Sequence, residues 1–322
     1  VYKRQGHAFN LGVGFDADPH NYGRIWFPCF DNFVERSTYT FEIITSNNRK
    51  AYCNGEMINE VVLSGDTIMR TWDMKESIPT YLACVAVGPY VDVKWTYQGI
   101  QSNIPVQIAV KANDSNKLKN SFVHLDDAMD IYEGSYGPYL FNKVGYSIVP
   151  FSSGAMEHAS NVAYPSNAVN GNTNSELLMA HELSHHWWGD LVTCETQEDM
   201  WLNEGWASYS EDLFLEHVYG RKSYEDAVRS RHLDVIQYAH FKEEKYWPVS
   251  GVPHRFTYGT HVYDKGASMA HNLRAYMGDT KFFAGIKKFM DDNKFSDVNS
   301  AQLRDELSTT SGIDLTAVSY TH

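Results

Sequence analysis

The run His-Glu-Leu-Ser-His at 181–185, followed by a glutamate nineteen positions later, constrains the fold of this chain more than any other feature. His181 and His185 are four positions apart, so a helix through them places both imidazoles on one face, about one turn apart. Glu204 can join them if the chain reverses after Gly189 and a second helix runs antiparallel to the first. The sequence therefore predicts a packed pair of helices at this point.

The spacing of the two histidines and the glutamate predicts a metal site. Two neutral imidazoles and one carboxylate can bind Zn²⁺ tetrahedrally and leave a fourth position open to water. We expect His181, His185 and Glu204 to be the ligands, and Glu182 to act as a base that takes a proton from a water at that position. His186 points about 100° away around the helix, so we expect it not to be a ligand. The alternative is a polar or core helix whose histidines match the pattern by chance.

Glu211 follows Glu204 by seven positions and shares its helical face. It could accept a hydrogen bond from a ligand imidazole and fix the tautomer of that ring. A solvated surface carboxylate explains the residue equally well. We expect the four nearby tryptophans to form core and pocket wall; these are Trp187, Trp188, Trp201 and Trp206.

The residue pattern changes along the chain. From about 36 to 110, short runs rich in Val, Ile, Thr, Tyr and Phe alternate with Asn, Gly and Ser clusters, which predicts a mostly antiparallel β region. Helical periodicity follows at 115–133, 174–188, 202–219, 264–277, 280–292 and 300–310. Thr173 with Glu176 predicts a capping box, and glycines predict helix ends at Gly189, Gly220 and Gly278. We expect an α+β protein with a partial β domain over 1–110 and a mostly helical domain over 111–322.

Composition excludes several classes of partner. The net charge is −13 and no basic cluster stands out, so neither nucleic acid nor an anionic membrane is an expected partner. The longest apolar stretches, such as 81–88, are far shorter than the roughly 20 residues that span a bilayer. The four cysteines are scattered without a pairing pattern, which predicts buried free thiols. No obligate protein partner is indicated.

The two ends of the chain differ from the rest. Residues 1–5 and 318–322 can both be translated from one transposase adapter sequence read on opposite strands. We therefore expect these ten residues to be non-native and the remainder to be an internal fragment. The location of the protein is left open.

Several motifs resemble those of the zinc aminopeptidases of the alanyl aminopeptidase (aminopeptidase N) family, which are gluzincins. "HELSH" and "LNEG" stand at the family spacing, and "GAMEH" at 154–158 is similar to its Gly-x-Met-Glu-Asn exopeptidase motif. "YGTHVYDKG" at 258–266 is similar to the segment that carries the family's catalytic tyrosine. "RIWFPCFD" at 24–31 and "SIPTYLACVAVGPY" at 77–90 resemble parts of its N-terminal β domain.

The resemblance implies a thermolysin-like catalytic domain with one Zn²⁺ per chain. It implies that Tyr263 donates a hydrogen bond to the oxyanion, and that Glu157 holds the free amine of the substrate. Taken alone, Glu157 could equally be a carboxylate at a loop turn. The substrate-binding segment also comprises Gly154, Ala155, Met156 and His158.

The chain departs from the family pattern at two places. His158 stands where the family usually has Asn, so the pocket for the first substrate residue is expected to differ. No Gln matches the family's substrate-contacting turn near the start, where Asp16 or Asp18 could substitute. By this resemblance, we also expect the helical domain that follows the catalytic domain in the family, and the first part of the β domain, to lie outside this sequence.

The sequence therefore favours a zinc aminopeptidase that acts on peptides with a free N-terminus. A thermolysin-like endopeptidase is a second hypothesis, which would need no amine anchor such as Glu157. A catalytically silent, zinc-stabilised binding module is a third. Free and N-acetylated peptides distinguish the first two, and the presence of all the catalytic residue types argues against the third.

Overall fold

The computed structural model describes residues 2–4, 6–152 and 154–320. By its internal contacts the chain divides into two compact units. The first comprises residues 1–126 and 139–186, and the second comprises residues 127–138 and 187–322.

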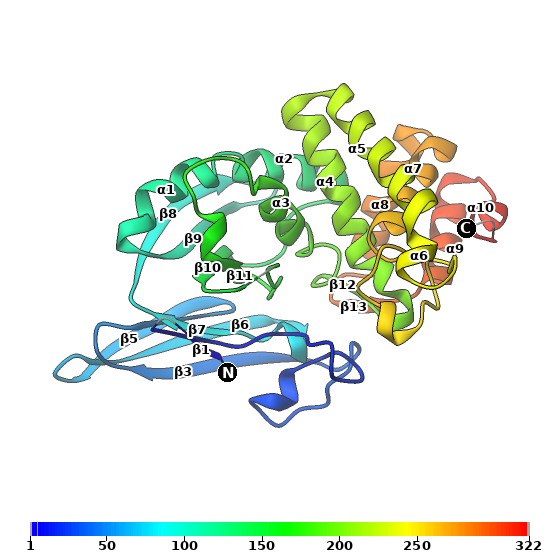
Figure 1. The fold of residues 1–322 in the computed structure, drawn as a ribbon. Helices are drawn as coiled ribbons and strands as arrows, with labels where there is room; N and C mark the ends of the chain where they lie inside the picture. Colours follow the sequence, from blue (N-terminus) through cyan, green and yellow to red (C-terminus); the bar gives the residue numbers. More distant parts are fainter. Residues whose placement is uncertain (1, 5, 153, 321–322) are drawn as a thin grey trace. The chain divides into compact units, whose positions relative to one another are not determined.

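The first unit is built on three β-sheets, drawn in blue to green in Figure 1. One sheet has the order β1-β2-β7-β4 and a second the order β3-β6-β5, with every pairing antiparallel. The third has the order β11-β10-β9-β8, in which β8 and β9 are antiparallel and the other pairs parallel. The strands are β1 (Tyr2–Arg4), β2 (His7–Phe9), β3 (Arg36–Thr45), β4 (Lys50–Cys53), β5 (Glu56–Ser64), β6 (Thr67–Pro79), β7 (Val85–Gly88), β8 (Tyr90–Gln98), β9 (Asn103–Lys111), β10 (Val144–Val149) and β11 (Val162–Pro165).

The third sheet supports the helix that carries the two histidines. All six residues of the central strand β10 are buried, as expected for a parallel strand inside a sheet, and all four residues of the edge strand β11 are buried as well. Helix α3 (Glu176–Ser184) is tied to these strands by Tyr146, whose hydroxyl donates to the carbonyl of Met179 at 3.0 Å. The other elements of this unit are α1 (Ser115–Ser121) and the short helices η1 (Gly23–Ile25), η2 (Thr80–Leu82), η3 (Ala112–Asp114) and η4 (Ser166–Ala168).

The second unit is mainly helical. Most of α2 belongs to it, and β12 and β13 form a short parallel pair. Its elements are α2 (Leu125–Tyr136), β12 (Val192–Cys194), η5 (Gln197–Leu202), α4 (Glu204–Tyr219), α5 (Arg221–Asp234), the π-helix η6 (Val235–Ala239), α6 (His240–Lys242), η7 (His254–Phe256), α7 (Asp264–Met277), α8 (Asp279–Asp292), β13 (Ser296–Val298), α9 (Ser300–Ser311) and α10 (Thr316–Tyr320).

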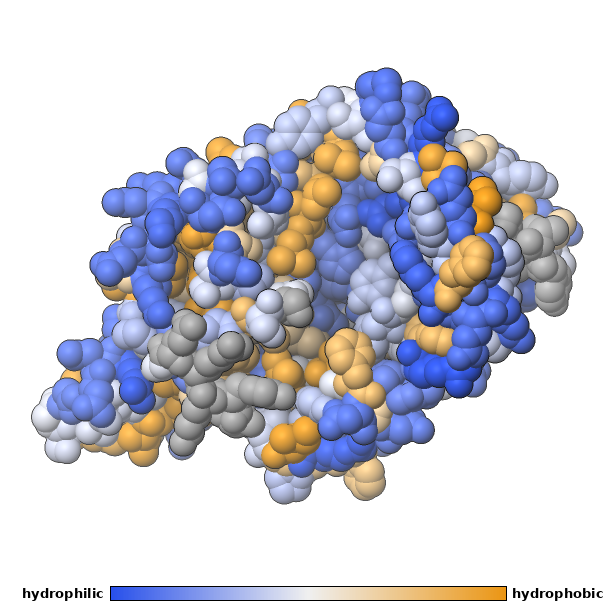
Figure 2. Space-filling view, in the orientation of Figure 1, coloured by the Kyte–Doolittle hydropathy of each residue, from blue (hydrophilic) through white to orange (hydrophobic). Residues whose placement is uncertain are grey.

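Stacked aromatic rings form part of the core of the second unit. Trp188 lies on Trp206 with ring centroids 4.0 Å apart, and Trp206 stacks on Phe282 of α8. All four tryptophans predicted to be core or wall are buried. Over α5, η6 and α6, drawn in yellow-green to yellow in Figure 1, the visible surface is mainly hydrophilic with a few separate hydrophobic residues (Figure 2).

The predicted α+β arrangement, β-rich first and helical afterwards, is confirmed. The four cysteines are free, as predicted, but only three of them are buried, because Cys29 is partly exposed. Two helix predictions were wrong in extent. The helix expected over 115–133 is broken where Phe122 leaves helical geometry and packs its ring against Tyr146 and Tyr164. The helix expected over 174–188 ends at Ser184, whose hydroxyl donates a hydrogen bond to the carbonyl of His181 at 2.7 Å.

Other local predictions had mixed outcomes. Gly220 and Gly278 end α4 and α7 with positive φ, as predicted. The capping box was wrong, because Ser175 is the N-cap of α3 and Thr173 offers Glu176 only its backbone carbonyl. Gly189 does not end a helix, since α3 stops five residues earlier. Helices α5 and α6 were not predicted.

The predicted domain boundary after residue 110 stays a prediction, and strands on both sides of it share one sheet. The expected non-native ends lie partly outside the described residues, at 1, 5, 321 and 322, and also stay a prediction. Among the described residues, none of the helices combines the length and the apolar character that a membrane span requires.

Candidate metal centre

Helix α3 presents two histidines from its last turn. His181 lies inside the helix, and His185 is its C-cap, with its N–H still bonded to the carbonyl of His181 at 3.3 Å. Their ring centroids are 4.8 Å apart. The four-residue spacing therefore places both imidazoles on one face, as the sequence indicated. Both side chains are buried.

Glu204 is the first residue of α4 and is also buried. The turn that leads into α4 is fixed by Asn203, whose side-chain oxygen accepts the N–H of Cys194 at 3.0 Å. One ligand atom each from His181, His185 and Glu204 lie within 4.8 Å of one another. Throughout the described part of the chain, this is the only group of three or more His, Cys, Asp or Glu side chains close enough to hold a metal ion.

The donor set suits zinc. Two imidazole nitrogens and one carboxylate oxygen are the ligands of a catalytic zinc site that keeps one position open. Burial also favours a metal here, because a buried carboxylate is costly unless a cation or hydrogen bonds compensate its charge. The residues present therefore fit Zn²⁺. Whether α3 and α4 run antiparallel, as expected from the sequence, stays a prediction.

Glu182 occupies the buried turn of α3 next to His181. Two tyrosines of the third sheet lie near it. Burial, with a smaller contribution from the Glu182 charge, raises the pKa of both Tyr146 and Tyr164. Both phenols therefore stay protonated and donate hydrogen bonds to α3 or the residue preceding it, Tyr146 to Met179 and Tyr164 to Ser175.

His186 is not part of the metal group. It is buried, and its Nδ1 lies 3.0 Å from the hydroxyl of Tyr139. Burial, reinforced by neighbouring positive groups, lowers the pKa of His186 to about 3, so the ring is neutral. This histidine is a core residue.

The segment at 154–158 lies beside β11. Met156 forms an antiparallel bridge with Ala163, with N–H to O distances of 3.0 and 2.9 Å, and Glu157 next to it is buried. Gly154 adopts a φ of +67°, which favours glycine. The roles of Gly154, Ala155, Met156 and Glu157 in substrate binding stay predictions.

His158 lies in the interior of the first unit. Its side chain is fully buried, and Nδ2 of Asn10 lies 3.3 Å from its Nε2. Burial lowers the pKa of His158 to about 3. Because Asn10 also bonds the backbone of Ala83 and Val85, the histidine is tied to the start of β7. A substrate-binding role for His158 stays a prediction.

Tyr263 is the N-cap residue of α7 and is half-buried. The starts of α4 and α7 touch through their backbones. A Cβ added at Gly205 would lie 2.8 Å from the Cα of Gly266 and 2.8 Å from the carbonyl oxygen of Val262. Within the second unit, Glu204 thus precedes Gly205 and Tyr263 follows Val262, and Gly205 and Val262 both belong to this close contact.

Glu211 binds a partner that sequence reasoning missed. Arg231 of α5 donates to Glu211 at 2.6 Å, to Asp212 at 3.1 Å and to Asp264 at 3.0 Å. Burial raises the pKa of Asp212 to about 7 even though Arg231 opposes the shift. No sequence signal pointed to Arg231, because α5 itself was not predicted. A contact of Glu211 with a ligand imidazole stays a prediction.

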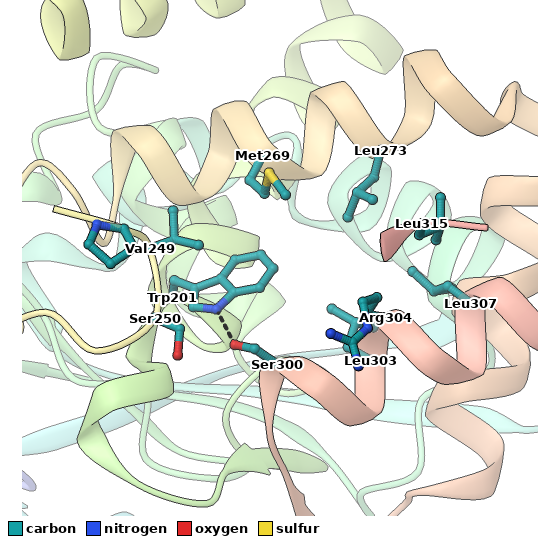
Figure 3. Close-up of a pocket in the computed structure, with 11 residues that line it drawn as sticks. Trp201, Val249, Ser250, Met269, Leu273, Ser300, Leu303, Arg304, Leu307 and Leu315 are labelled. Atoms are coloured by element: carbon teal, nitrogen blue, oxygen red, sulfur yellow. Dashed lines mark hydrogen bonds between the residues drawn. The ribbon is translucent and has the colours of Figure 1, made fainter. Parts of the chain in front are cut away.

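A small cavity is lined by Trp201, which stands three residues before Glu204. It has a volume of about 90 Å³ and is mostly apolar, with Met269 and Leu273 on α7 opposite α9 (Figure 3). The Trp201 indole N–H donates to Ser300 at 2.7 Å, and both residues line the cavity. Trp201 therefore is a cavity wall, as predicted.

Comparison with known proteins matches most of the chain to one family. A profile of the Peptidase family M1 domain matches residues 120–322, and one of the Peptidase M1 N-terminal domain matches residues 4–82. Probable aminopeptidase 1 of Sulfurisphaera tokodaii is 24% identical over 92% of this chain and 39% of its own length. Glutamyl aminopeptidase of Sus scrofa is 27% identical over 99% of this chain and 35% of its own length.

The chain thus spans little more than a third of the length of these curated relatives. Among solved structures, an M1 zinc metallopeptidase from Deinococcus radiodurans has a TM-score of 0.86 at 20% identity, covering 99% of this chain and 70% of that one. This likeness shows the fold alone.

Proposed function

Since the chain belongs to peptidase family M1, we propose that it carries the catalytic site of a zinc-dependent aminopeptidase. The observation that supports this best is the buried group of His181, His185 and Glu204, with ligand atoms within 4.8 Å of one another. A Zn²⁺ ion held there would act as a Lewis acid on the scissile carbonyl and would lower the pKa of water at the open position.

The chain's own residues supply the rest of the chemistry. Glu182 accepts a proton from the attacking water and passes it to the leaving nitrogen. Tyr263 donates a hydrogen bond to the oxyanion that forms on the substrate carbonyl. Glu157 accepts a charge-assisted hydrogen bond from the α-ammonium group, which sets how many residues fit before the scissile bond. The substrates are peptides with a free N-terminus.

Zinc content tests the metal site. We expect about one zinc per chain in the parent and His186→Ala proteins, and much less in His185→Ala. The reason is that His185 belongs to the metal group and His186 does not. The two variants make the same change at adjacent buried positions. Circular dichroism checks that each is folded. Equal zinc in both folded variants would contradict the ligand assignment.

Substrate choice and the base are tested together. We expect alanine p-nitroanilide to be hydrolysed and its N-acetylated form not, because the blocked amine cannot pair with Glu157. Glu182→Gln should retain zinc and lose nearly all turnover. Hydrolysis of blocked internal peptide bonds would instead indicate an endopeptidase. Zinc with no turnover in the parent would favour a zinc-stabilised binding module, and full turnover in Glu182→Gln would refute the base.

A further inference from the structure

One buried carboxylate holds the segment that leads into α7. Glu243 follows α6 and is 3% exposed. It accepts hydrogen bonds from the backbone N–H of Thr260, from Nδ1 of His261 at 2.5 Å and, more weakly, from the backbone N–H of His261 at 3.4 Å. A side chain at Gly259 would collide with this carboxylate. Three donors from two consecutive residues therefore converge on Glu243.

His261 links the same segment to a second one. Its ring is fully buried, and Nε2 accepts the backbone N–H of Trp247 at 3.0 Å. This bond fixes the tautomer, so that Nδ1 carries the hydrogen that is donated to Glu243. Trp247 in turn donates its indole N–H to the carbonyl of Glu243 at 2.8 Å and accepts a hydrogen bond from Lys265 at 2.5 Å. Residues 243–247 and 260–265 are thus joined at several points.

This network lies immediately before Tyr263. The N–H of Tyr263 bonds the carbonyl of Gly259 at 3.0 Å, so the turn that Glu243 holds also sets the backbone of Tyr263. We propose that Glu243, acting with His261, is a positioning residue that fixes where the phenol of Tyr263 lies. The proposal rests on the proposed function, in which Tyr263 stabilises the oxyanion. Such a donor works only if it is already in place when charge develops.

The chemistry of the network requires a carboxylate at this position. A carboxylate carries several lone pairs and can accept all three hydrogen bonds. A glutamine has the same shape, but its NH₂ group would face at least one N–H donor. The His261 ring cannot relieve this conflict by changing tautomer, because Trp247 occupies its Nε2. Glu243→Gln should therefore let the turn shift while the helices around it stay folded.

The chain offers a matched control at the next residue. The side chain of Glu244 is 61% exposed and forms an ion pair with the equally exposed Arg255. With alanine p-nitroanilide, we expect Glu243→Gln to lower kcat about tenfold to a hundredfold, as a misplacement of about 1 Å would. KM and zinc per chain should stay within about twofold of the parent. Glu244→Gln should match the parent in all three.

A double substitution separates this proposal from the proposed function. If Glu243 acts through Tyr263, Glu243→Gln will cost no further turnover in a Tyr263→Phe background. The same loss in both backgrounds would overturn the inference. So would a Glu243→Gln protein as active as Glu244→Gln. If Tyr263→Phe itself leaves kcat unchanged, the role of Tyr263 in the proposed function fails instead.

A readout independent of turnover completes the test. In protein labelled with 3-fluorotyrosine, the ¹⁹F resonance of Tyr263 is the one lost in Tyr263→Phe. We expect it to shift or broaden in Glu243→Gln and in His261→Gln, and to stay unchanged in Glu244→Gln. His261→Gln removes the Nδ1 bond but keeps an acceptor near Trp247, so it serves if Glu243→Gln does not fold. An unchanged resonance in a folded variant of either residue would overturn the proposal.

Discussion

Arg231 is a single positive charge that pairs with several carboxylates. Its side chain is largely buried and donates to three carboxylates, those of Glu211, Asp212 and Asp264. Asp212 is the most buried of the three, with a side chain 1% exposed. Burial therefore raises the pKa of Asp212 to about 7, against the attraction of Arg231 and with help from the charge of Glu211.

This shift predicts a defined pH dependence of stability. The usual pKa of an aspartate is 3.8, so between about pH 4 and 7 the folded chain binds a proton at Asp212 that the unfolded chain has released. The free energy of unfolding then falls as pH rises through this window, by up to about 1.4 kcal/mol per unit of pKa shift. Asp212→Asn removes this titration, and its oxygen can still accept from Arg231. We therefore expect the free energy of unfolding of the variant, measured in urea, to rise relative to that of the parent as the pH is raised from 4.5 to 7.5.

Glu216 provides a control of opposite sign. Burial opposes the shift, but hydrogen bonds from Arg274 and Arg221 hold the pKa of Glu216 below its usual value. Its contribution to stability is present above the unfolded pKa and is lost as pH falls through the folded one. Glu216→Gln should therefore cost more at pH 7 than at pH 3. The same pH trend in both variants would refute the assignment to Asp212.

At the scale of elements, two glycines set the distance between α4 and α7. Because Cβ atoms at Gly205 and Gly266 would meet backbone atoms at 2.8 Å, an alanine at Gly205 must push the helices apart. Such overpacking costs about 1–3 kcal/mol. We expect Gly205→Ala to lower both stability and zinc content, because Glu204 precedes this contact. Thermal unfolding and elemental analysis measure the two effects.

Gly134 is the matched control for this change. It lies on the exposed side of α2, and an added Cβ would meet nothing within 4 Å. Gly134→Ala should therefore raise stability by up to about 1 kcal/mol through helix propensity and leave zinc content unchanged. If Gly205→Ala behaved in the same way, the backbone contact would not set the position of Glu204.

The extent of sequence prediction also follows from the elements. His181, His185 and Glu204 could be found because helix spacing is fixed and α4 begins at Glu204, close to the predicted start. Arg231 and Glu243 could not be found, because no motif and no helical spacing connects them with the residues they bond, which lie 17 or more positions away. Helix α5 was also hidden, since it buries only Tyr224 and Val228 and so lacks a clear apolar stripe.

At the scale of the whole molecule, the metal group predicts that stability depends on zinc. An ion that binds the folded chain and not the unfolded one stabilises the fold by RT ln(1 + [L]/Kd), which is about 4.1 kcal/mol at a thousandfold excess over Kd. Without the ion, the buried carboxylate of Glu204 loses the cation proposed to compensate it. We therefore expect a chelator to lower the Tm of the parent protein by several degrees, and added zinc to restore it.

His185→Ala separates metal removal from a general effect of the chelator. This variant should have a lowered Tm in the absence of chelator and should respond little to either chelator or zinc, because one of its three ligands is gone. His186→Ala should lose stability through its core position and yet keep the full response to both reagents. A parent Tm unaffected by chelation, with zinc shown to be removed, would contradict this prediction, because an ion that binds the folded chain in preference to the unfolded one must raise the free energy of unfolding.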